Sequence, residues 1–549
     1  MTLQGRSIGD ASPRKVSVPK WKADCLAIHS SVEAGIINPG SEGMAVGKNV
    51  KSETVSVHRL DGNTWLTKLE RISALAISKP ETVFNSIGHV IGVEMLRELY
   101  QQMDGKKAVG IDKVTKVKYG KRLEDNLNNL IQRIRRGTYK SQPSRIVEIQ
   151  KEDGSSRPLA IACFEDKLVQ FAVNTILNKI FEPIFLPSSY GFRPKLNCHN
   201  ALIALKAAVY RFPNGTIVEI DLRKYFNSIP HQVLLEYLQK KISDKRFLHL
   251  VQVLMTAPIC VGDVVEKNAI GCQQGSSISP ILANIYLHYV IDSWFEEIKK
   301  SHIQGDAELV RYADDMVFVF ERKRDAERFY EVLPKRLGKY GLTLHVDKSQ
   351  VIASGKSAAQ AAARNGDRLP TYKFLGFTCY WGLSKGNKFW RLKYTSRADR
   401  FTSKLKGLRK FLREHLNAKT DETIIQVIRV VVGWINYHGI SDNERRVREF
   451  IYWTKRMLFW WINRRGGRKR MNWGSFSKML ERLNFPKKFK TVSMFPRALN
   501  RAESSSNHGN RMREFCTYGS EEGPAGVIRL VYSHGFSQQA YLKTVHIVA

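Results

Sequence analysis

Asp314 and Asp315 are two adjacent acids set between two short apolar runs, residues 308–312 and 316–320. This pattern predicts a β-hairpin that carries both carboxylates at or near its tip. Two like charges side by side repel and raise each other's pKa, so the arrangement does not help the fold. A bound divalent cation would turn the repulsion into attraction, and Mg²⁺ prefers carboxylate oxygens. A solvated turn is the alternative for an isolated Asp-Asp pair. The metal hypothesis therefore needs partners elsewhere in the chain.

A third acid, Asp221, closes the apolar run 216–220, and this run predicts a strand that ends on a carboxylate. Asp221 and Asp314 are 93 residues apart (314 − 221), so only tertiary structure can bring them together. Between them, residues 271–280 form a glycine- and serine-rich turn, and a long helix is expected to begin behind it at Ile281.

The composition indicates a multidomain protein with a polyanionic partner. A chain of 549 residues is too long for one core and should hold three or four domains. It carries 88 basic and 51 acidic residues, a formal charge of +37, which favours nucleic acid as the partner. No apolar run reaches the roughly 20 residues of a membrane span. Seven scattered cysteines without a Cys-x-x-Cys pair argue against a disulfide framework or a zinc ribbon, and a reducing interior is the simplest compartment.

The predicted elements mix strands and helices without strict alternation, which is typical of an α+β sheet domain with helical layers. Helical periodicity covers most of residues 65–102. Two strands are expected around the turn 152–154, a helix over 326–337, and a strand over 341–349 that leads to Lys348.

Two basic runs follow the predicted sheet domain. Residues 397–413 contain seven basic residues and one acid, and residues 445–470 contain ten and one. A single run is as often a solvated helix face, but two runs interleaved with aromatic residues favour a helical nucleic-acid-binding module. The candidate RNA-binding residues are Arg397, Arg400, Lys404, Lys406, Arg409, Lys410, Arg413, Trp434 and Tyr437.

The order of these segments resembles the group II intron reverse transcriptase/maturase family over about residues 68–486. Residues 433–439 are similar to the maturase signature of the family's thumb region. Each motif is weak by itself, whereas the series is specific. In chain order the other motifs are Gly110-Ile111-Asp112, Arg157-Pro158-Leu159, Tyr190 to Pro194, the strand ending at Asp221, Gln274 to Leu287, Tyr312 to Asp315, Lys348 and Phe374 to Phe377.

The resemblance implies a right-hand polymerase of the α+β class, with fingers and palm followed by a mostly helical thumb. The tail is a candidate DNA-binding segment. A zinc-stabilised endonuclease is not expected there, because after Pro486 the only cysteine is Cys516 and the histidines lie far apart. The expected divisions are an N-terminal extension at 1–60, fingers and palm at 61–385, the thumb/maturase RNA-binding domain at 386–486, and the tail at 487–549.

The resemblance also implies how the metal site works. Asp221, Asp314 and Asp315 would hold two Mg²⁺ ions about 4 Å apart, with the backbone carbonyl of Leu222 as a further ligand. One ion would lower the pKa of the primer 3′-hydroxyl, and the other would neutralise the triphosphate and leaving group. Lys348 would donate a proton to pyrophosphate, with a surface lysine as the alternative.

Five further residues match substrate-binding positions of the family. Lys151 and Arg157, on the two strands of the fingers hairpin, match the triphosphate clamp. Phe226 matches the steric gate that would reject a ribose 2′-hydroxyl, although a core aromatic is the commoner fate of such a residue. Gln274 and Gly275 would let the backbone approach the template and the incoming base pair.

The chain departs from the family pattern near these positions. The usual Pro-Gln-Gly-Gly reads Gln273 to Ser276, and a common Asp after the gate is Asn227. Ala160 and Ala162 replace a Gly and a Pro. These changes bear on polymerase efficiency, while the metal acids are intact.

We therefore expect an RNA-directed DNA polymerase encoded by a group II intron, which binds its intron RNA to aid splicing and copies it into cDNA during retrohoming. The implied partners are intron RNA, target DNA and dNTPs, with no membrane and the oligomeric state open. A bacterial cytoplasm is expected, with an organelle as the alternative. A non-intron bacterial reverse transcriptase for defence, diversity generation or repair is one rival, against which the maturase-like segment argues. A splicing-only RNA-binding maturase is another, against which the three acids argue.

Overall fold

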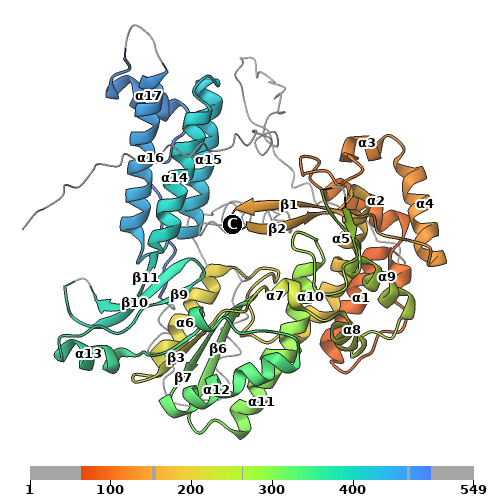
Figure 1. Ribbon diagram of the computed structural model, residues 1–549, viewed down its shortest axis with the longest axis horizontal. Helices are drawn as coiled ribbons and strands as arrows, with labels where there is room; N and C mark the ends of the chain where they lie inside the picture. Colours follow the sequence, from red (N-terminus) through yellow and green to blue (C-terminus); the bar gives the residue numbers. More distant parts are fainter. Residues whose placement is uncertain (1–63, 151–155, 263, 385, 466–469, 496–549) are drawn as a thin grey trace, which may run out of the picture. The chain divides into compact units, whose positions relative to one another are not determined.

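Four antiparallel strands form the sheet on which the acids lie. The computed structural model describes residues 64–150, 156–262, 264–384, 386–465 and 470–495. The strands of this palm sheet are ordered β6-β7-β3-β8 (Figure 1). Their bounds are β3 Thr216–Ile220, β6 Ala307–Tyr312, β7 Asp315–Phe320 and β8 Gln350–Ala353.

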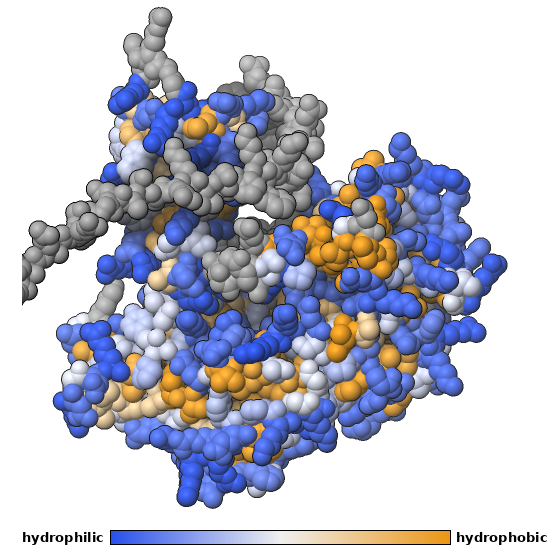
Figure 2. Space-filling view, viewed as in Figure 1, coloured by the Kyte–Doolittle hydropathy of each residue, from blue (hydrophilic) through white to orange (hydrophobic). Residues whose placement is uncertain are grey.

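Both faces of the palm sheet are buried, so most positions of its central strands β3 and β7 are apolar. On one face Val218, Ile220 and Phe318 belong to a large core, to which three helices of the palm contribute. On the other face Ile217 and Val319 pack in a second core with α6 (Cys198–Arg211). The three helices are α10 (Ser279–Leu287), α11 (Ser293–Ser301) and α12 (Lys323–Lys339), and the outer surface over α11 and α12 is mostly hydrophilic (Figure 2).

A second sheet belongs to the fingers, where two distant parts of the chain meet. Its strand order is β2-β1-β4-β5, and β1 pairs antiparallel with β2 but parallel with β4. The strands are β1 Ser144–Gln150, β2 Ser156–Ile161, β4 Ile259–Val261 and β5 Val264–Glu266. The accompanying helices are α1 Trp65–Ser78, α2 Val93–Gln102, α3 Lys116–Gly120, α4 Leu123–Arg136, α5 Phe164–Phe181, α8 His231–Gln239 and α9 Lys245–Met255.

The thumb is a bundle of helices with a core of its own. Figure 1 shows α14, α15 and α16 running alongside one another. Its helices are α14 Ala398–Glu414, α15 Thr420–His438, α16 Glu444–Arg464 and α17 Trp473–Arg482. A three-stranded sheet of order β11-β10-β9 precedes it, with α13 (Lys356–Arg364) before these strands, which are β9 Tyr372–Phe374, β10 Phe377–Leu383 and β11 Trp390–Ser396.

Buried polar contacts attach the thumb to the palm. Lys206 of α6 lies 3.1 Å from Asp442, which follows α15, and both side chains are almost inaccessible to solvent. Arg391 of β11 contacts the same carboxylate at 2.9 Å. The Tyr437 hydroxyl donates to the Leu375 carbonyl at 2.9 Å. Because a charge is buried at low cost only when it is paired, these contacts fix one arrangement of the two parts.

The structure confirms the α+β class, the hairpin around the acids, the two strands around 152–154 and the helices beginning near 281 and 326. It corrects the strand expected at 341–349, where Val346–Lys348 is a 3₁₀ turn and β8 begins only at Gln350. The expected boundary at 385/386 falls between β10 and β11, which pair with each other, and the helical region begins at Ala398. The N-terminal extension and nearly all of the tail lie outside the described residues. In the described segments, no helix has the length and apolarity that crossing a membrane requires.

Candidate active site

The acidic hairpin turns in two residues, Ala313 and Asp314, because Tyr312 pairs with Asp315 in the ladder. Ala313 has a φ of +56°, a left-handed conformation that costs a residue with a Cβ roughly 1–2 kcal/mol. Gly191 allows the neighbouring loop to approach this turn, because a Cβ there would lie 2.3 Å from the Ala313 nitrogen. The tip is therefore strained and closely packed, which is typical of a functional turn.

Asp221 lies beside this tip. The ladder between β3 and β7 pairs Ile220 with Met316, so Asp221, the first residue after β3, is level with Asp315. The Asp221 N–H donates to Ser349 Oγ at 3.1 Å, and its carbonyl accepts from the His345 N–H at 2.8 Å. These bonds fix the backbone of Asp221 although β3 has ended. The sheet thus brings Asp221 next to Asp314 and Asp315, although 93 residues separate Asp221 from Asp314 in the sequence.

The electrostatics of the three acids favour a bound cation. Desolvation raises the pKa of Asp314, and the charge of Asp221 adds to this effect. Desolvation and the charge of Asp314 raise the pKa of Asp315 to about 7. The Asp315 residue is exposed, and the negative charges of Asp314 and Asp221 raise its pKa in the same direction as desolvation. A cation would relieve the repulsion between these charges.

The donor set fits Mg²⁺, which takes one or two protein carboxylates and completes its shell with water and phosphate oxygens. Within the described segments, no three His, Cys, Asp or Glu side chains already converge on one metal position. The carboxylates would therefore adjust when an ion binds. Lys348 lies next to this set, with its Nζ 3.6 Å from Asp221 Oδ2.

Arg157 of the fingers also faces the acids. It is exposed at the start of β2, and its charge favours the ionised form of Asp314. A cation at the position of Arg157 would contact the phosphates of a nucleotide bound at the three acids. Lys151, the other expected clamp residue, lies outside the described residues.

Phe226 lies on the short helix α7 (Tyr225–Ser228), five residues after Asp221. Its ring is half-buried and meets the Tyr225 ring edge-to-face at 5.4 Å between centroids. It is thus neither a fully buried core residue nor a free surface one.

Gln274 and Gly275 bring the loop before α10 against the end of β2. The Ala160 N–H donates to the Gln274 carbonyl at 2.7 Å. Gly275 has a φ of +100°, and a Cβ there would lie 2.7 Å from Leu159 Cδ1, so glycine is required on both counts. The Gln274 side chain donates to Asn227 Oδ1 at 3.1 Å, which joins the loop to the residue after Phe226.

Ser276 stands where the family has a second glycine, and it is buried. Its hydroxyl has no hydrogen-bond partner among the described residues. A buried hydroxyl without a partner costs about 1–3 kcal/mol, so this departure from the family pattern destabilises the loop.

The basic residues of α14 divide into two groups. Lys406, Arg409, Lys410 and Arg413 are exposed, as an RNA-binding surface requires. Arg397, Arg400 and Lys404 are half-buried near the start of the helix. Arg400 packs beside Gly376, where a Cβ would lie 2.5 Å from its Nη1, and its charge favours the ionised form of Asp315.

The buried ring of Trp434 is not available to RNA, which corrects the expectation of an RNA contact, whereas Tyr437 is half-buried and stays a proposed contact. Trp434 is buried in the thumb core and stacks on Phe450 with centroids 4.5 Å apart. Tyr437 stacks on Phe377 at 5.9 Å, and its hydroxyl is bound to the Leu375 carbonyl. Both residues support the thumb and its attachment to the palm.

The outer face of α16 carries aromatic residues that were not singled out as candidates. Tyr452 and Trp460 are about half exposed. Arg456 lies between them, donating to the Tyr452 hydroxyl at 2.9 Å and standing 5.2 Å from the Trp460 ring. Their spacing of four residues is the sequence signal that places all three on one helix face.

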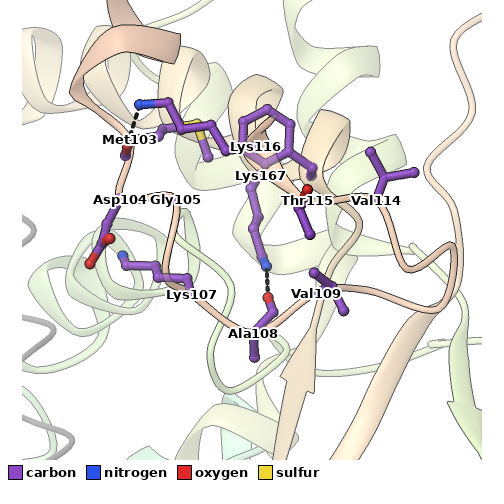
Figure 3. A pocket seen from close by; sticks show the side chains of 11 residues that line it. Met103, Asp104, Gly105, Lys107, Ala108, Val109, Val114, Thr115, Lys116 and Lys167 are labelled. Carbon is purple, nitrogen blue, oxygen red and sulfur yellow. Dashed lines mark hydrogen bonds between the residues drawn. The ribbon is translucent and has the colours of Figure 1, made fainter. Parts of the chain in front are cut away.

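A small hollow in the fingers lies next to the Gly110-Ile111-Asp112 motif (Figure 3). Lys167 donates to the Ala108 carbonyl at 2.5 Å, and burial lowers its pKa to about 8. Lys116 donates to the Met103 carbonyl at 2.6 Å. Because both ammonium groups bind backbone carbonyls, they hold the loop between α2 and α3 rather than a ligand.

Comparison with known proteins agrees with this geometry. Residues 149–379 match the family model "Reverse transcriptase (RNA-dependent DNA polymerase)". Residues 398–478 match "Group II intron, maturase-specific domain". The first match ends inside β10, and the second begins at Ala398, the first residue of α14, where the thumb helices begin.

Three relatives give the extent of the similarity. The chain is 31% identical to "Protein YkfC" of Escherichia coli over 278 residues, 45% of this chain and 73% of that protein. It is 33% identical to "Group II intron-encoded protein LtrA" of Lactococcus lactis over 223 residues, 40% of this chain and 37% of LtrA. It is 25% identical to "Putative COX1/OXI3 intron 1 protein" of Saccharomyces cerevisiae over 466 residues, 70% of this chain and 53% of that protein. The chain thus spans about half or less of the last two relatives. Two adjoining family models and an acidic hairpin beside Asp221 lead to one conclusion: the chain belongs to the group II intron-encoded reverse transcriptase/maturase family.

Proposed function

We propose that this protein is an RNA-directed DNA polymerase that binds a group II intron RNA, aids its splicing and copies it into cDNA. The observation that carries the proposal is the position of Asp221 directly after the last pair of the β3–β7 ladder, level with Asp315, with Asp314 on the adjoining turn. Folding alone gives no reason to place three repelling carboxylates there. The proposed partners are the intron RNA, target DNA and dNTPs.

In this proposal Asp221, Asp314 and Asp315 hold Mg²⁺, with the Leu222 carbonyl as a further ligand. The bound ions would supply activation of the primer 3′-hydroxyl and neutralisation of triphosphate charge. Arg157, which already acts on Asp314 electrostatically, binds the triphosphate, together with Lys151. Lys348, 3.6 Å from Asp221, is placed to give a proton to the leaving pyrophosphate.

The remaining proposed residues select the substrate. The Phe226 ring stands beside the sugar of the incoming nucleotide and excludes a 2′-hydroxyl. Gln274, held by Asn227, and Gly275, whose lack of a side chain lets the loop pack against Leu159 of β2, place this backbone next to the base pair.

The RNA is proposed to bind the thumb. The exposed cations of α14 contact phosphates, and the Tyr452–Arg456–Trp460 face of α16 adds rings on which bases can stack. Such phosphate contacts make affinity fall with salt, by about 0.7–0.9 in log–log slope for each contact.

The test separates the two activities. Asp314→Asn removes a metal ligand, so primer extension should fall by several orders of magnitude while intron RNA affinity stays within about twofold. Reversing Arg409, Lys410 and Arg413 to Glu should weaken RNA binding and flatten its salt slope by about two units or more. Filter binding across a salt series and extension of a primed RNA template measure both effects.

A matched control reverses three exposed basic residues of α12, Arg324, Arg328 and Lys335, which gives the same change in net charge on the palm. This variant should keep the native salt slope. The division of labour is wrong if Asp314→Asn loses RNA binding as severely as polymerisation, or if the α14 variant behaves like the α12 control.

A further inference from the structure

Arg311 is a completely buried arginine on β6, two residues before the acidic turn. Burying a guanidinium is expensive unless all of its donors are satisfied. Here the charge partner is Asp292, equally buried, which accepts from Nε at 2.7 Å and from Nη2 at 2.6 Å. Such a bidentate pair fixes orientation as well as charge.

The remaining three donors of Arg311 reach three other segments. Nη1 donates to the carbonyl of Ala313 at 3.1 Å and to Asn284 Oδ1 of α10 at 3.1 Å. Nη2 donates to Ser189 Oγ at 2.7 Å. All five N–H groups are thus used, and one of them holds the strained residue of the turn.

The partners of Arg311 are themselves tied to the turn. Asn284 Nδ2 donates to the Gly191 carbonyl at 2.7 Å, and Gly191 packs against the Ala313 backbone. The Tyr190 N–H donates to the Arg311 carbonyl at 2.8 Å. The loop 189–191, α10 and the turn therefore form one unit with the guanidinium at its centre.

A short π-helix, His288–Asp292, delivers the counter-ion. π-Helices are rare and are frequent at functional sites. Its loosened carbonyls are bound by Arg336 of α12, which donates to Val290 at 3.0 Å and to Tyr289 at 3.3 Å. One arginine thus stabilises the π-helix backbone, and the other binds the carboxylate at its end.

We propose that Arg311 is a positioning residue for polymerisation: its buried pair with Asp292 and its bond to the Ala313 carbonyl hold the turn in the conformation that aims Asp314 and Asp315 at the metal. The residue touches neither substrate nor metal and acts through the turn. The inference rests on the proposed function for its catalytic consequence, but its effect on the metal acids is independent of nucleotide transfer.

The variant Arg311→Lys tests this, because lysine keeps the charge but has three donors on a point charge instead of a planar fork. Mn²⁺ binding to the full-length protein, followed by electron paramagnetic resonance, should weaken by about tenfold or more, as for other residues that orient metal ligands. In primer extension, kcat should fall while the KM for dNTP stays unchanged. The affinity for intron RNA should equal that of the native protein.

Lys206→Met is the matched control, since it removes a cation from the other fully buried ion pair described above and leaves Asp442 with Arg391. It should lower stability yet leave Mn²⁺ affinity native. If Arg311→Lys does not fold, Ser189→Ala tests the proposal instead. This variant removes one of the five acceptors of the Arg311 guanidinium and should still weaken Mn²⁺ binding by a few-fold.

The proposal is overturned if a folded Arg311→Lys, or Ser189→Ala in its place, binds Mn²⁺ with native affinity. It is also overturned if the Lys206→Met control weakens Mn²⁺ binding as much, because the effect would then be one of general stability. If the native protein extends no primer, the proposed function fails, and the Mn²⁺ comparison still decides the role of Arg311.

Discussion

The joint between thumb and palm should weaken in mild acid because of His438. This histidine is buried at the end of α15, where its Nδ1 lies 3.1 Å from Ser396 Oγ. Burial is the main cause that lowers its pKa from 6.5 to about 3, and the positive charges of Arg400 and Lys404 add to it. A folded-state pKa below the unfolded value means that the contribution to stability is complete above pH 6.5. It is then lost as the pH falls from 6.5 towards 3.

The magnitude follows from linkage. At pH 5 the histidine is protonated in the unfolded state and neutral in the folded state. This pH lies 1.5 units below the unfolded pKa of 6.5. At 1.36 kcal/mol for each unit, this costs about 2 kcal/mol of unfolding free energy. Other groups titrate as well: the pKa of His288 is lowered to about 4, and that of Asp166 is raised to about 6, which has the opposite effect. They are present in native protein and variant alike, so they cancel in the difference between the two.

The assay is urea unfolding of the native protein and of His438→Gln, each at pH 7 and pH 5, followed by tryptophan fluorescence. The variant should be less stable at pH 7, and the gap to the native protein should shrink by about 2 kcal/mol at pH 5. His302→Gln, at an exposed position after α11, should leave the native pH dependence unchanged. A gap of the same size at both pH values would refute the reasoning.

Two further predictions concern the substrate site. Phe226→Ala should raise incorporation of ribonucleotides relative to deoxynucleotides with unchanged Mg²⁺ dependence, and unaltered sugar discrimination in primer extension would contradict the gate. Ser276→Ala removes a buried hydroxyl that has no partner among the described residues, so thermal unfolding should shift to higher temperature by the equivalent of about 1 kcal/mol. An unchanged or lower melting temperature would mean that the hydroxyl is satisfied.

The acidic hairpin was predictable because its signal is local. Apolar runs on both sides of Asp314 and Asp315 define the strands, and repelling charges at a turn indicate a ligand. The neighbouring Asp221 needed a tertiary pairing, which the resemblance supplied and which the β3–β7 register now gives. In contrast, the prediction of a strand at 341–349 was wrong, because Val346 is exposed and the chain turns at this point. The turn brings Lys348 to Asp221.

For Trp434, the prediction of an RNA contact from its aromatic character was wrong. This residue lies on α15 at helical spacing from Ile424, Val427 and Val431, all of them buried. That periodicity was available in the sequence and predicts the core rather than an RNA contact. For Arg311 the sequence predicts only that a buried partner exists, because a charge in an apolar strand requires one. It does not identify Asp292 as that partner, because the π-helix that carries Asp292 has no recognisable sequence pattern.

The sheet order has a consequence for synthesis of the chain. β3 lies between β7 and β8, so both of its edges stay without native partners while the ribosome makes the next part. β3 ends at Ile220 and β7 begins at Asp315, a delay of roughly 5–20 s at 5–20 residues per second. During that interval an apolar strand, Thr216 to Ile220, is open to pairing with other nascent chains. Chaperone supply and translation speed should therefore affect how much of this protein reaches its folded state.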